Sequence, residues 1–199
     1  MFSWDMPYTS NRQPILAGNV VATSQPLAAQ AGLQMLKDGG NAVDAALATA
    51  ITLTVVEPAM NGIGSDAFCI LWDGNQLRGL NASGRSPISW SPDRFRDFSH
   101  MPVTGWDSVT VPGCVSAWSE LSQRFGNLPF TKLFETAIQY AEGGYAVGPI
   151  TAEAWAVAAK KLGHFAEFSN TFLPQGRAPL PGERFVCRQQ ARTLQKIAE

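Results

Sequence analysis

The sequence predicts an α+β protein, and three observations carry this prediction. Small and apolar residues recur at helical spacing in two adjacent segments between Ser24 and Val56. Two short apolar runs then flank the turn Asp73–Asn75, a pattern typical of a β-hairpin. Helical periodicity returns from Cys114 towards the end of the chain. Helices together with a hairpin place the chain in the mixed class.

The composition is that of a folded chain without a charged partner. The 199 residues suffice for one domain with a core, and the last helical pattern runs to Glu199 without a stop signal. We therefore expect residues 1–199 to form a single, incomplete domain from a longer protein. Hydrophobic residues make up 45% and charged residues 16%, which excludes a disordered chain. The formal net charge is -1 without a basic run, so we expect no nucleic acid and no membrane as partners.

The cysteines and the N-terminus indicate a reduced, cytoplasmic protein. Neither a disulfide framework nor a zinc motif fits the spacing of Cys69, Cys114 and Cys187. With two histidines in the whole chain, we expect no metal cluster. The irregular arm expected over Met1–Ala17 contains no apolar signal region, and the apolar run Ala45–Val56 is too short to span a bilayer.

The first elements expected after the arm are a strand and a helix. The β-branched character of Asn19–Thr23 suggests the strand. Ser24 offers an N-cap hydroxyl, and Pro26 suits a first helical turn. The glycine pair Gly39–Gly40 ends this helix, because glycine accepts the left-handed backbone of a C-terminal cap.

The second helix is the most apolar element of the chain. Asn41 is a good N-cap residue for it, and Pro58 stops it. Between Val43 and Val56 the only charge is Asp44, in the first turn, where the helix dipole favours a carboxylate. A helix that is apolar on nearly every side must be enclosed on nearly every side. We therefore expect a central helix packed against a sheet.

The remaining elements follow from turn signals and periodicity. The hairpin is expected to pair Phe68–Trp72 with Gln76–Leu80, and a loop rich in Ser, Pro and Gly follows over Ser83–Pro92. Val109–Val111 suggests a short strand, and Ser169–Glu183 a surface loop. Helices are predicted at about Cys114–Phe125, Lys132–Glu142, Ile150–Leu162 and Gln189–Ala198.

Three local patterns have both a chemical and a structural interpretation. Gly62–Ala67 fits the GxGxxA form of a dinucleotide fingerprint, but it follows a helix and precedes a strand, so a tight loop is favoured. Cys114, after Pro-Gly at a helix start, is either an activated nucleophile or, more commonly, a small buried residue. His100 and His164 are either general bases or, more commonly, loop histidines.

Arg85 is the candidate binding residue. It lies in the loop Asn81–Pro87, directly after the hairpin. A guanidinium at a strand end suits bidentate binding of a carboxylate. The alternative is a surface arginine, or one that donates to loop carbonyls, and local chemistry alone leaves both interpretations open.

Four blocks of the chain, in this order, resemble the gamma-glutamyltranspeptidase (gamma-glutamyltransferase) family of glutathione-hydrolysing N-terminal nucleophile hydrolases. The blocks are GGNAVDAALA, VVEP followed by GIGSDAF, TVPGCVSAW and FTKLFETAIQYAEGGYAV. The resemblance extends from about Asn19 to about Ala198 and implies a four-layer αββα sandwich that is incomplete in this chain. It implies no metal and no organic cofactor.

The resemblance also implies a precursor that cleaves itself into a large and a small subunit. The new N-terminal threonine of the small subunit would be the nucleophile and, through its α-amine, the base. This chain matches the N-terminal part of the large subunit and lacks the family's Thr-Thr-His type motif. We therefore expect no catalytic residue in this chain, which alone would be inactive. The implied partners are a small gamma-glutamyl or other acyl amide, the rest of the large subunit and the small subunit, with a homodimer left open.

One departure from the family concerns substrate binding. Typical members carry Arg-Glu-x-Ala-Pro after the hairpin, and that arginine grips the α-carboxylate of the glutamyl group. Aligning Pro87 with the proline places Ser83 at the arginine, Gly84 at the glutamate and Arg85 two positions later. Ser83 and Arg85 are therefore the expected substrate-binding residues. An acylase acting on another amide, such as a cephalosporin side chain, and a non-catalytic homologue serving as a binding protein are the alternatives.

Overall fold

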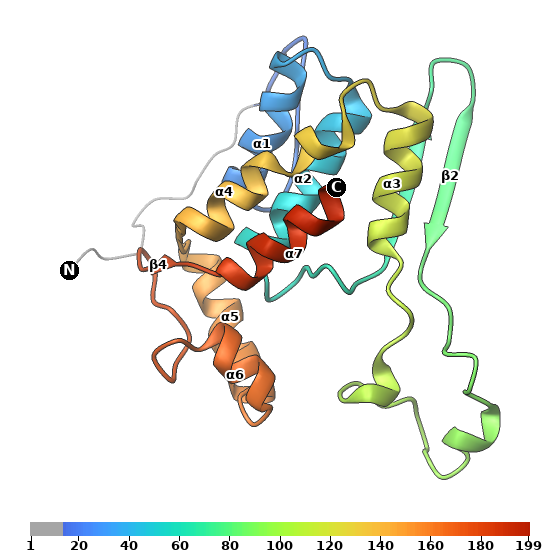
Figure 1. Cartoon of the computed structure of the whole chain (residues 1–199), viewed down its shortest axis with the longest axis vertical. Coiled ribbons are helices and arrows are strands. Elements are labelled where there is room, and N and C mark those ends of the chain that lie inside the picture. Colours follow the sequence, from blue (N-terminus) through green and yellow to red (C-terminus); the bar gives the residue numbers. More distant parts are fainter. Residues whose placement is uncertain (1–13) are drawn as a thin grey trace. The chain divides into compact units, whose positions relative to one another are not determined.

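The structure, a computed structural model, describes residues 14–199 (Figure 1). The first thirteen residues of the arm expected over Met1–Ala17 lie outside the described residues. The chain forms two compact units. The first unit comprises the residues up to Asn61 and those from Gly126, and the second comprises Gly62–Phe125. The prediction of one domain over residues 1–199 stays a prediction.

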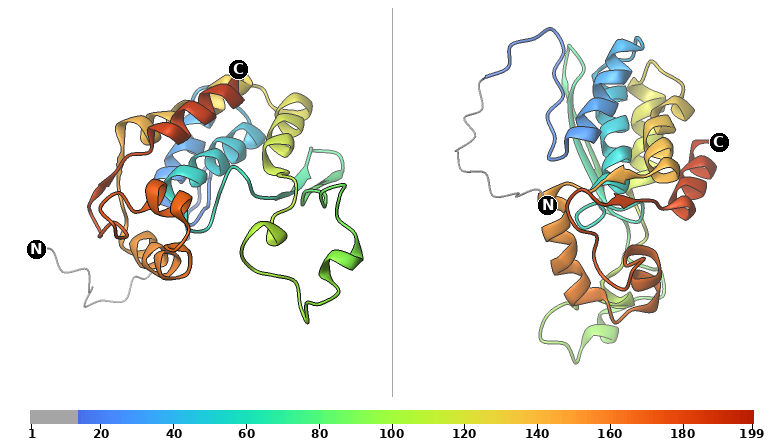
Figure 2. Two further views of the ribbon diagram at one scale, coloured as in Figure 1. Left: turned by 60° about the horizontal axis from the view of Figure 1, so that its bottom comes forward. Right: turned by 90° about the vertical axis from the view of Figure 1, so that its left-hand side faces the viewer.

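The first unit is a bundle of helices. Helix α1 (Pro26–Lys37) packs against α2 (Ala42–Val56), and α4 (Glu135–Gly143) packs on α2 as well. Helix α7 (Arg188–Ala198) lies along α4, as Figure 2 shows, and the 3₁₀ segment η3 (Phe130–Phe134) contacts α2, α4 and α7. The predicted helices are confirmed, and their bounds differ from the prediction by at most three residues.

Helix α2 is the centre of this bundle. Its side chains Leu47, Ile51, Val55 and Val56 are almost completely buried, which confirms the prediction of an enclosed helix. Within the first unit its main neighbours are helices, whereas we had expected a sheet. An apolar surface all round a helix requires cover on every side, but it does not specify whether helices or strands provide that cover.

The N-terminus of α2 is closed by two polar residues. The Asn41 Oδ1 atom accepts from the N–H groups of Val43 and Asp44, and Asp44 accepts from the Asn41 N–H at 2.8 Å. The predicted N-cap is therefore confirmed as a capping box. The buried Asp44 carboxylate also accepts from the N–H groups of Asn127 at 3.0 Å and Leu128 at 3.3 Å. One carboxylate thus joins α2 to the chain that leads into η3.

The start of α1 differs from the prediction. The Gln25 side chain, and not the Ser24 hydroxyl, caps the helix by accepting from Leu27 and Ala28. The Ser24 hydroxyl instead donates to Glu57 Oε2 at 2.7 Å. Asn19–Thr23 is not a strand, because a strand requires a partner that the described chain does not place beside it.

Between α4 and α7 the first unit contains a helical hairpin and a small ladder. Helix α5 (Pro149–Leu162) contacts α6 (Ala166–Phe172), which replaces the first part of the predicted surface loop. The strands β3 (Tyr145–Ala146) and β4 (Arg184–Phe185) pair antiparallel. The indole of Trp155 is 1% exposed and donates to the Phe172 carbonyl at 3.0 Å, which fixes α6 to α5.

The second unit contains the predicted hairpin. Strand β1 (Ala67–Trp72) pairs antiparallel with β2 (Leu77–Ala82), with Cys69 opposite Leu80. Helix α3 (Cys114–Phe125) runs along the hairpin (Figure 1). The opposite face of the hairpin leaves four large apolar side chains more than 60% exposed, namely Phe68, Ile70, Trp72 and Leu77.

A long excursion joins β2 to α3. It contains the short 3₁₀ segments η1 (Pro92–Phe95) and η2 (Trp106–Ser108), and the strand predicted at Val109–Val111 does not form. The Phe95 ring packs edge-on against Trp90, and Arg94 bonds Asp107 at 2.7 Å. Within residues 14–199, no helix is both long enough and apolar enough to cross a membrane.

Candidate functional site

A broad groove lies in the second unit, where β2 ends. Its volume is about 1010 Å³. One side is formed by Leu80–Ser86 with Ile88, and the other by Val111–Gly113 with the first turns of α3. Both predicted binding residues therefore line the same cavity.

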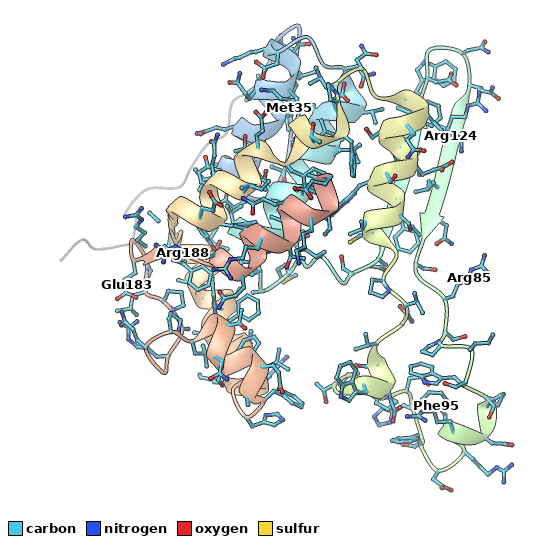
Figure 3. All side chains as sticks on the ribbon, viewed as in Figure 1. Met35, Arg85, Phe95, Arg124, Glu183 and Arg188 are labelled. Atoms are coloured by element: carbon cyan, nitrogen blue, oxygen red, sulfur yellow. The ribbon has the colours of Figure 1, made fainter. Side chains whose placement is uncertain are left out.

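Arg85 is the unpaired cation of this groove. Its side chain extends away from the backbone ribbon (Figure 3) and is exposed to solvent. No described residue forms an ion pair or a side-chain hydrogen bond with its guanidinium. The open alternative of an arginine that donates to loop carbonyls is therefore not what the structure shows. All donors of the fork are available for a carboxylate.

Ser83 lies beside Arg85 and is also exposed. Its backbone N–H donates to the Asn81 side chain at 3.0 Å, which forms a tight turn at the end of β2. Among residues 14–199, the only partner of its hydroxyl is the Gly84 carbonyl, at a long 3.5 Å. The hydroxyl is thus free to donate to a bound oxygen. The Ser83 hydroxyl can therefore add a hydrogen bond to a bound carboxylate, but it cannot supply the positive charge of an arginine.

The segment before α3 holds this loop. The Val111 N–H donates to the Arg85 carbonyl at 2.9 Å, and the Thr110 hydroxyl donates to the Ser83 carbonyl at 3.4 Å. Thr110 was not among the predicted site residues. The β-branched residues at 109–111, which suggested a strand, could have indicated its role. The backbone groups of an extended segment need hydrogen-bond partners, and here the Arg85 loop provides them.

Cys114 is a structural residue. It is 2% exposed, and its thiol donates to the Ile63 carbonyl at 2.8 Å. Burial raises the pKa of this thiol, so the neutral form dominates at neutral pH. This is the more common of the two interpretations given above, and it argues against a nucleophile. Gly62–Ala67 follows α2 and opens β1, the reverse of the order that a dinucleotide fingerprint requires.

The histidines are not brought to the groove. His100 contacts the neighbouring Ser99 hydroxyl at 3.0 Å in the excursion, and His164 packs on Phe165 in the first unit. Both are exposed. No cluster of three metal-binding side chains occurs in the described chain. The groove can therefore bind a carboxylate, but the described residues around it do not include a nucleophile paired with a base.

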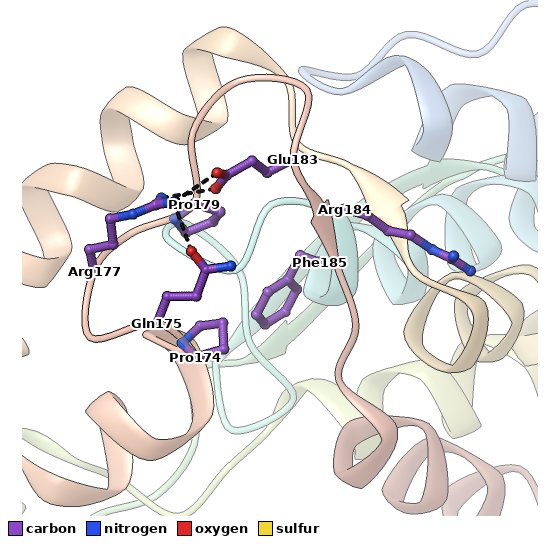
Figure 4. A pocket seen from close by; sticks show the side chains of 7 residues that line it. All are labelled: Pro174, Gln175, Arg177, Pro179, Glu183, Arg184 and Phe185. Carbon is purple, nitrogen blue, oxygen red and sulfur yellow. Dashed lines mark hydrogen bonds and ion pairs between the residues drawn. The ribbon is translucent and has the colours of Figure 1, made fainter.

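A second cavity, of about 170 Å³, lies in the loop after α6 (Figure 4). Arg177 bonds both oxygens of Glu183, at 2.9 and 2.8 Å, and also donates to Gln175. These hydrogen bonds hold the pKa of Glu183 at about 2. The guanidinium of Arg184 donates to the Gly143 carbonyl. Since its charged groups already have partners, this cavity is a weaker candidate than the groove.

Comparison with known proteins supports the fold. The family model described as gamma-glutamyltranspeptidase matches residues 28–199. A glutathione hydrolase-like proenzyme of Bacillus subtilis is 36% identical over 195 residues, which is 95% of this chain and 37% of that protein. The chain spans roughly a third of the length of the curated relatives it matches.

Solved structures show the same fold. The cephalosporin acylase from Bacillus halodurans is 45% identical, with a TM-score of 0.89 over 98% of this chain and 38% of that chain. The gamma-glutamyltranspeptidase of Helicobacter pylori is 26% identical, with a TM-score of 0.87 over 94% of this chain and 56% of that chain. These similarities confirm the α+β fold class and the N-terminal nucleophile hydrolase architecture, of which this chain contains a part.

Proposed function

The chain belongs to the gamma-glutamyltranspeptidase family, and on this premise we propose that it forms the front part of a precursor that cleaves or transfers gamma-glutamyl amides. The observation that supports this most is the unpaired Arg85 in an open groove beside Ser83. A guanidinium without a partner in the described chain provides the charge that an amino-acid carboxylate requires.

In this proposal the chain binds substrate and other segments do the chemistry. Arg85 grips the α-carboxylate of the glutamyl group, and the Ser83 hydroxyl donates to the same group. The nucleophile is an N-terminal threonine outside these 199 residues. It attacks the amide carbonyl, the amine leaves, and water or an acceptor amine then resolves the ester. No metal or organic cofactor takes part.

The partners in this proposal are the rest of the large subunit and the small subunit of the same precursor. The exposed side chains Phe68, Ile70 and Trp72 form an apolar face on a two-stranded sheet. Two strands alone rarely form a stable sheet, and a face of this kind is suited to a second layer of strands. We infer that the rest of the precursor covers it.

A second candidate function keeps the fold and changes the acyl group. It is favoured by the serine at position 83, where the resemblance leads us to expect the family's arginine. The cephalosporin acylase from Bacillus halodurans shows that this fold also occurs in an acylase. In this alternative the groove accepts an acyl group whose carboxylate lies elsewhere, or an acyl group without one.

Two amides that differ only in the carboxylate test the proposal on the full-length protein. Gamma-glutamyl 4-nitroanilide carries the α-carboxylate, and 4-aminobutyryl 4-nitroanilide lacks it. We expect two bands on a denaturing gel after self-cleavage, and a KM about tenfold lower or better for the glutamyl compound, because one charge-assisted contact contributes about 1.5–3 kcal/mol. Equal KM values favour the second candidate. An uncleaved protein that hydrolyses neither amide contradicts both and leaves a binding protein.

A further inference from the structure

Two glycines, which have no side chain, allow the loop that carries Arg85 to lie close to the segment before α3. Gly84 has a φ of +79°, and a Cβ atom there would collide with the Val111 carbonyl oxygen. A Cβ atom at Gly113 would collide with the Ala82 carbonyl oxygen and lie 2.8 Å from its carbon. Real Cβ atoms do not approach backbone atoms this closely. The two segments can therefore lie at this separation only while both positions are glycine.

The two sides of this contact are not held equally. The N–H groups of Gly113 and Cys114 both donate to the Ser65 carbonyl, at 3.2 and 3.0 Å. The Cys114 thiol adds a bond to the Ile63 carbonyl. By contrast, Ser83 and Arg85 are exposed, and their carbonyls accept from Thr110 and Val111 of that same segment. A side chain added at Gly113 would therefore move the Arg85 loop rather than the start of α3.

We propose that Gly84 and Gly113 are positioning residues that set where the Arg85 guanidinium lies in the groove, and so determine the preference for acyl groups that carry a carboxylate. The proposal rests on the carboxylate-binding role of Arg85 given above. Bidentate recognition depends on both the position and the plane of the guanidinium, and a displacement of about 1 Å is enough to weaken it. Both glycines line the groove, but neither has a side chain that could bind the carboxylate. Both act through Arg85.

Gly113→Ala in the full-length protein tests the proposal. We expect KM for gamma-glutamyl 4-nitroanilide to rise about tenfold, while kcat and the KM for 4-aminobutyryl 4-nitroanilide stay within about twofold of wild type. Gly148→Ala is the matched control, because Gly148 has an extended backbone (φ -71°) and no atom within 4 Å of an added Cβ. The control should leave both KM values unchanged.

A double-mutant cycle with Arg85→Ala shows whether Gly113 acts through Arg85. We expect Gly113→Ala to cause no further rise of KM when Arg85 is already absent. Equal rises of KM in both backgrounds, or an equal rise for both amides, would overturn the positioning role. If Arg85→Ala by itself leaves KM unchanged, the proposed function fails instead, so the two failures are distinguishable.

A milder variant covers the case in which Gly113→Ala does not fold, as judged by loss of its thermal transition. Thr110→Val removes the hydroxyl that donates to the Ser83 carbonyl, and Thr110→Ser keeps it. We expect Thr110→Val to raise KM for the glutamyl amide about threefold, and Thr110→Ser to leave it near wild type. Equal KM values for these two variants would contradict the proposal.

Discussion

Asp44 links two separate segments of the first unit. Its buried carboxylate accepts from three backbone N–H groups, those of Asn41, Asn127 and Leu128. We expect Asp44→Ala to lower the free energy of unfolding by about 3 kcal/mol, because three donors lose a charged partner. Denaturant unfolding measures this. Asp66→Ala is the control, since Asp66 is exposed and its side chain makes no hydrogen bond in the described chain. Similar losses in both variants would contradict this role of Asp44.

Two buried threonines of α2 differ in whether their hydroxyl groups have a hydrogen-bond partner. Thr52 is completely buried, and its hydroxyl has no partner in the described chain. The Thr54 hydroxyl donates to the Ile51 carbonyl at 2.7 Å. We expect Thr52→Val to raise the free energy of unfolding by about 1 kcal/mol, and Thr54→Val to lower it by a similar amount. Urea midpoints decide this, and a destabilised Thr52→Val would show that the hydroxyl has a partner after all.

At the scale of elements, the hairpin turn has a pH dependence that follows from Asp73. Its carboxylate accepts from the N–H groups of Gln76 and Asn75 and from Arg78, and these bonds lower its pKa from 3.8 to about 2. A pKa lowered by folding means that the ionised form stabilises the hairpin. The contribution is complete above pH 3.8 and is lost as the pH falls towards 2.

An NMR titration of the labelled aspartate carboxyl groups measures this pKa directly. We expect a titration near 2 for Asp73, and Arg78→Ala should move it part of the way back because the backbone donors remain. Asp73→Asn should abolish the dependence of hairpin stability on pH in this range. A midpoint at or above 3.8 for Asp73 would mean that the hydrogen bonds of the turn do not stabilise its ionised carboxylate.

Elements with local signals were predictable from the sequence, and elements that depend on distant partners were not. The N-cap at Asn41 and the turn Asp73–Asn75 each lie within a few residues, so both were predicted correctly. The strand expected at Asn19–Thr23 had suitable residues but no neighbour in the described chain. The ladder of β3 and β4 has two residues a side, and its strands are recognisable only once the chain has folded.

The same distinction applies to the candidate site. Arg85 could be named because a charged loop after a hairpin is visible in the sequence, and Ser83 because the resemblance to the family places it at the position of the family's arginine. The contact of Gly84 with Val111 could not, because it joins segments separated by the whole excursion. Whether Arg85 was already paired was also beyond the sequence. Only the arrangement in space shows that its guanidinium has no partner in the described chain.

At the scale of the whole molecule, the apolar face of the hairpin predicts association. Ile70 is 81% exposed beside Phe68 and Trp72. We expect the 199-residue chain alone to self-associate, and Ile70→Thr to weaken that association while preserving β-branched character. Sedimentation velocity measures the change. Val157→Thr, at an exposed site on α5, is the matched control and should have no effect. A chain that stays monomeric at high concentration would contradict this use of the face.

The central claim is that Arg85 grips the carboxylate of an acyl amide. The most direct test is the KM of full-length Arg85→Ala for gamma-glutamyl 4-nitroanilide, measured against 4-aminobutyryl 4-nitroanilide. We predict a rise of about tenfold or more for the first amide, the equivalent of about 1.5–3 kcal/mol, with little change for the second. An unchanged KM for the glutamyl amide would contradict the claim.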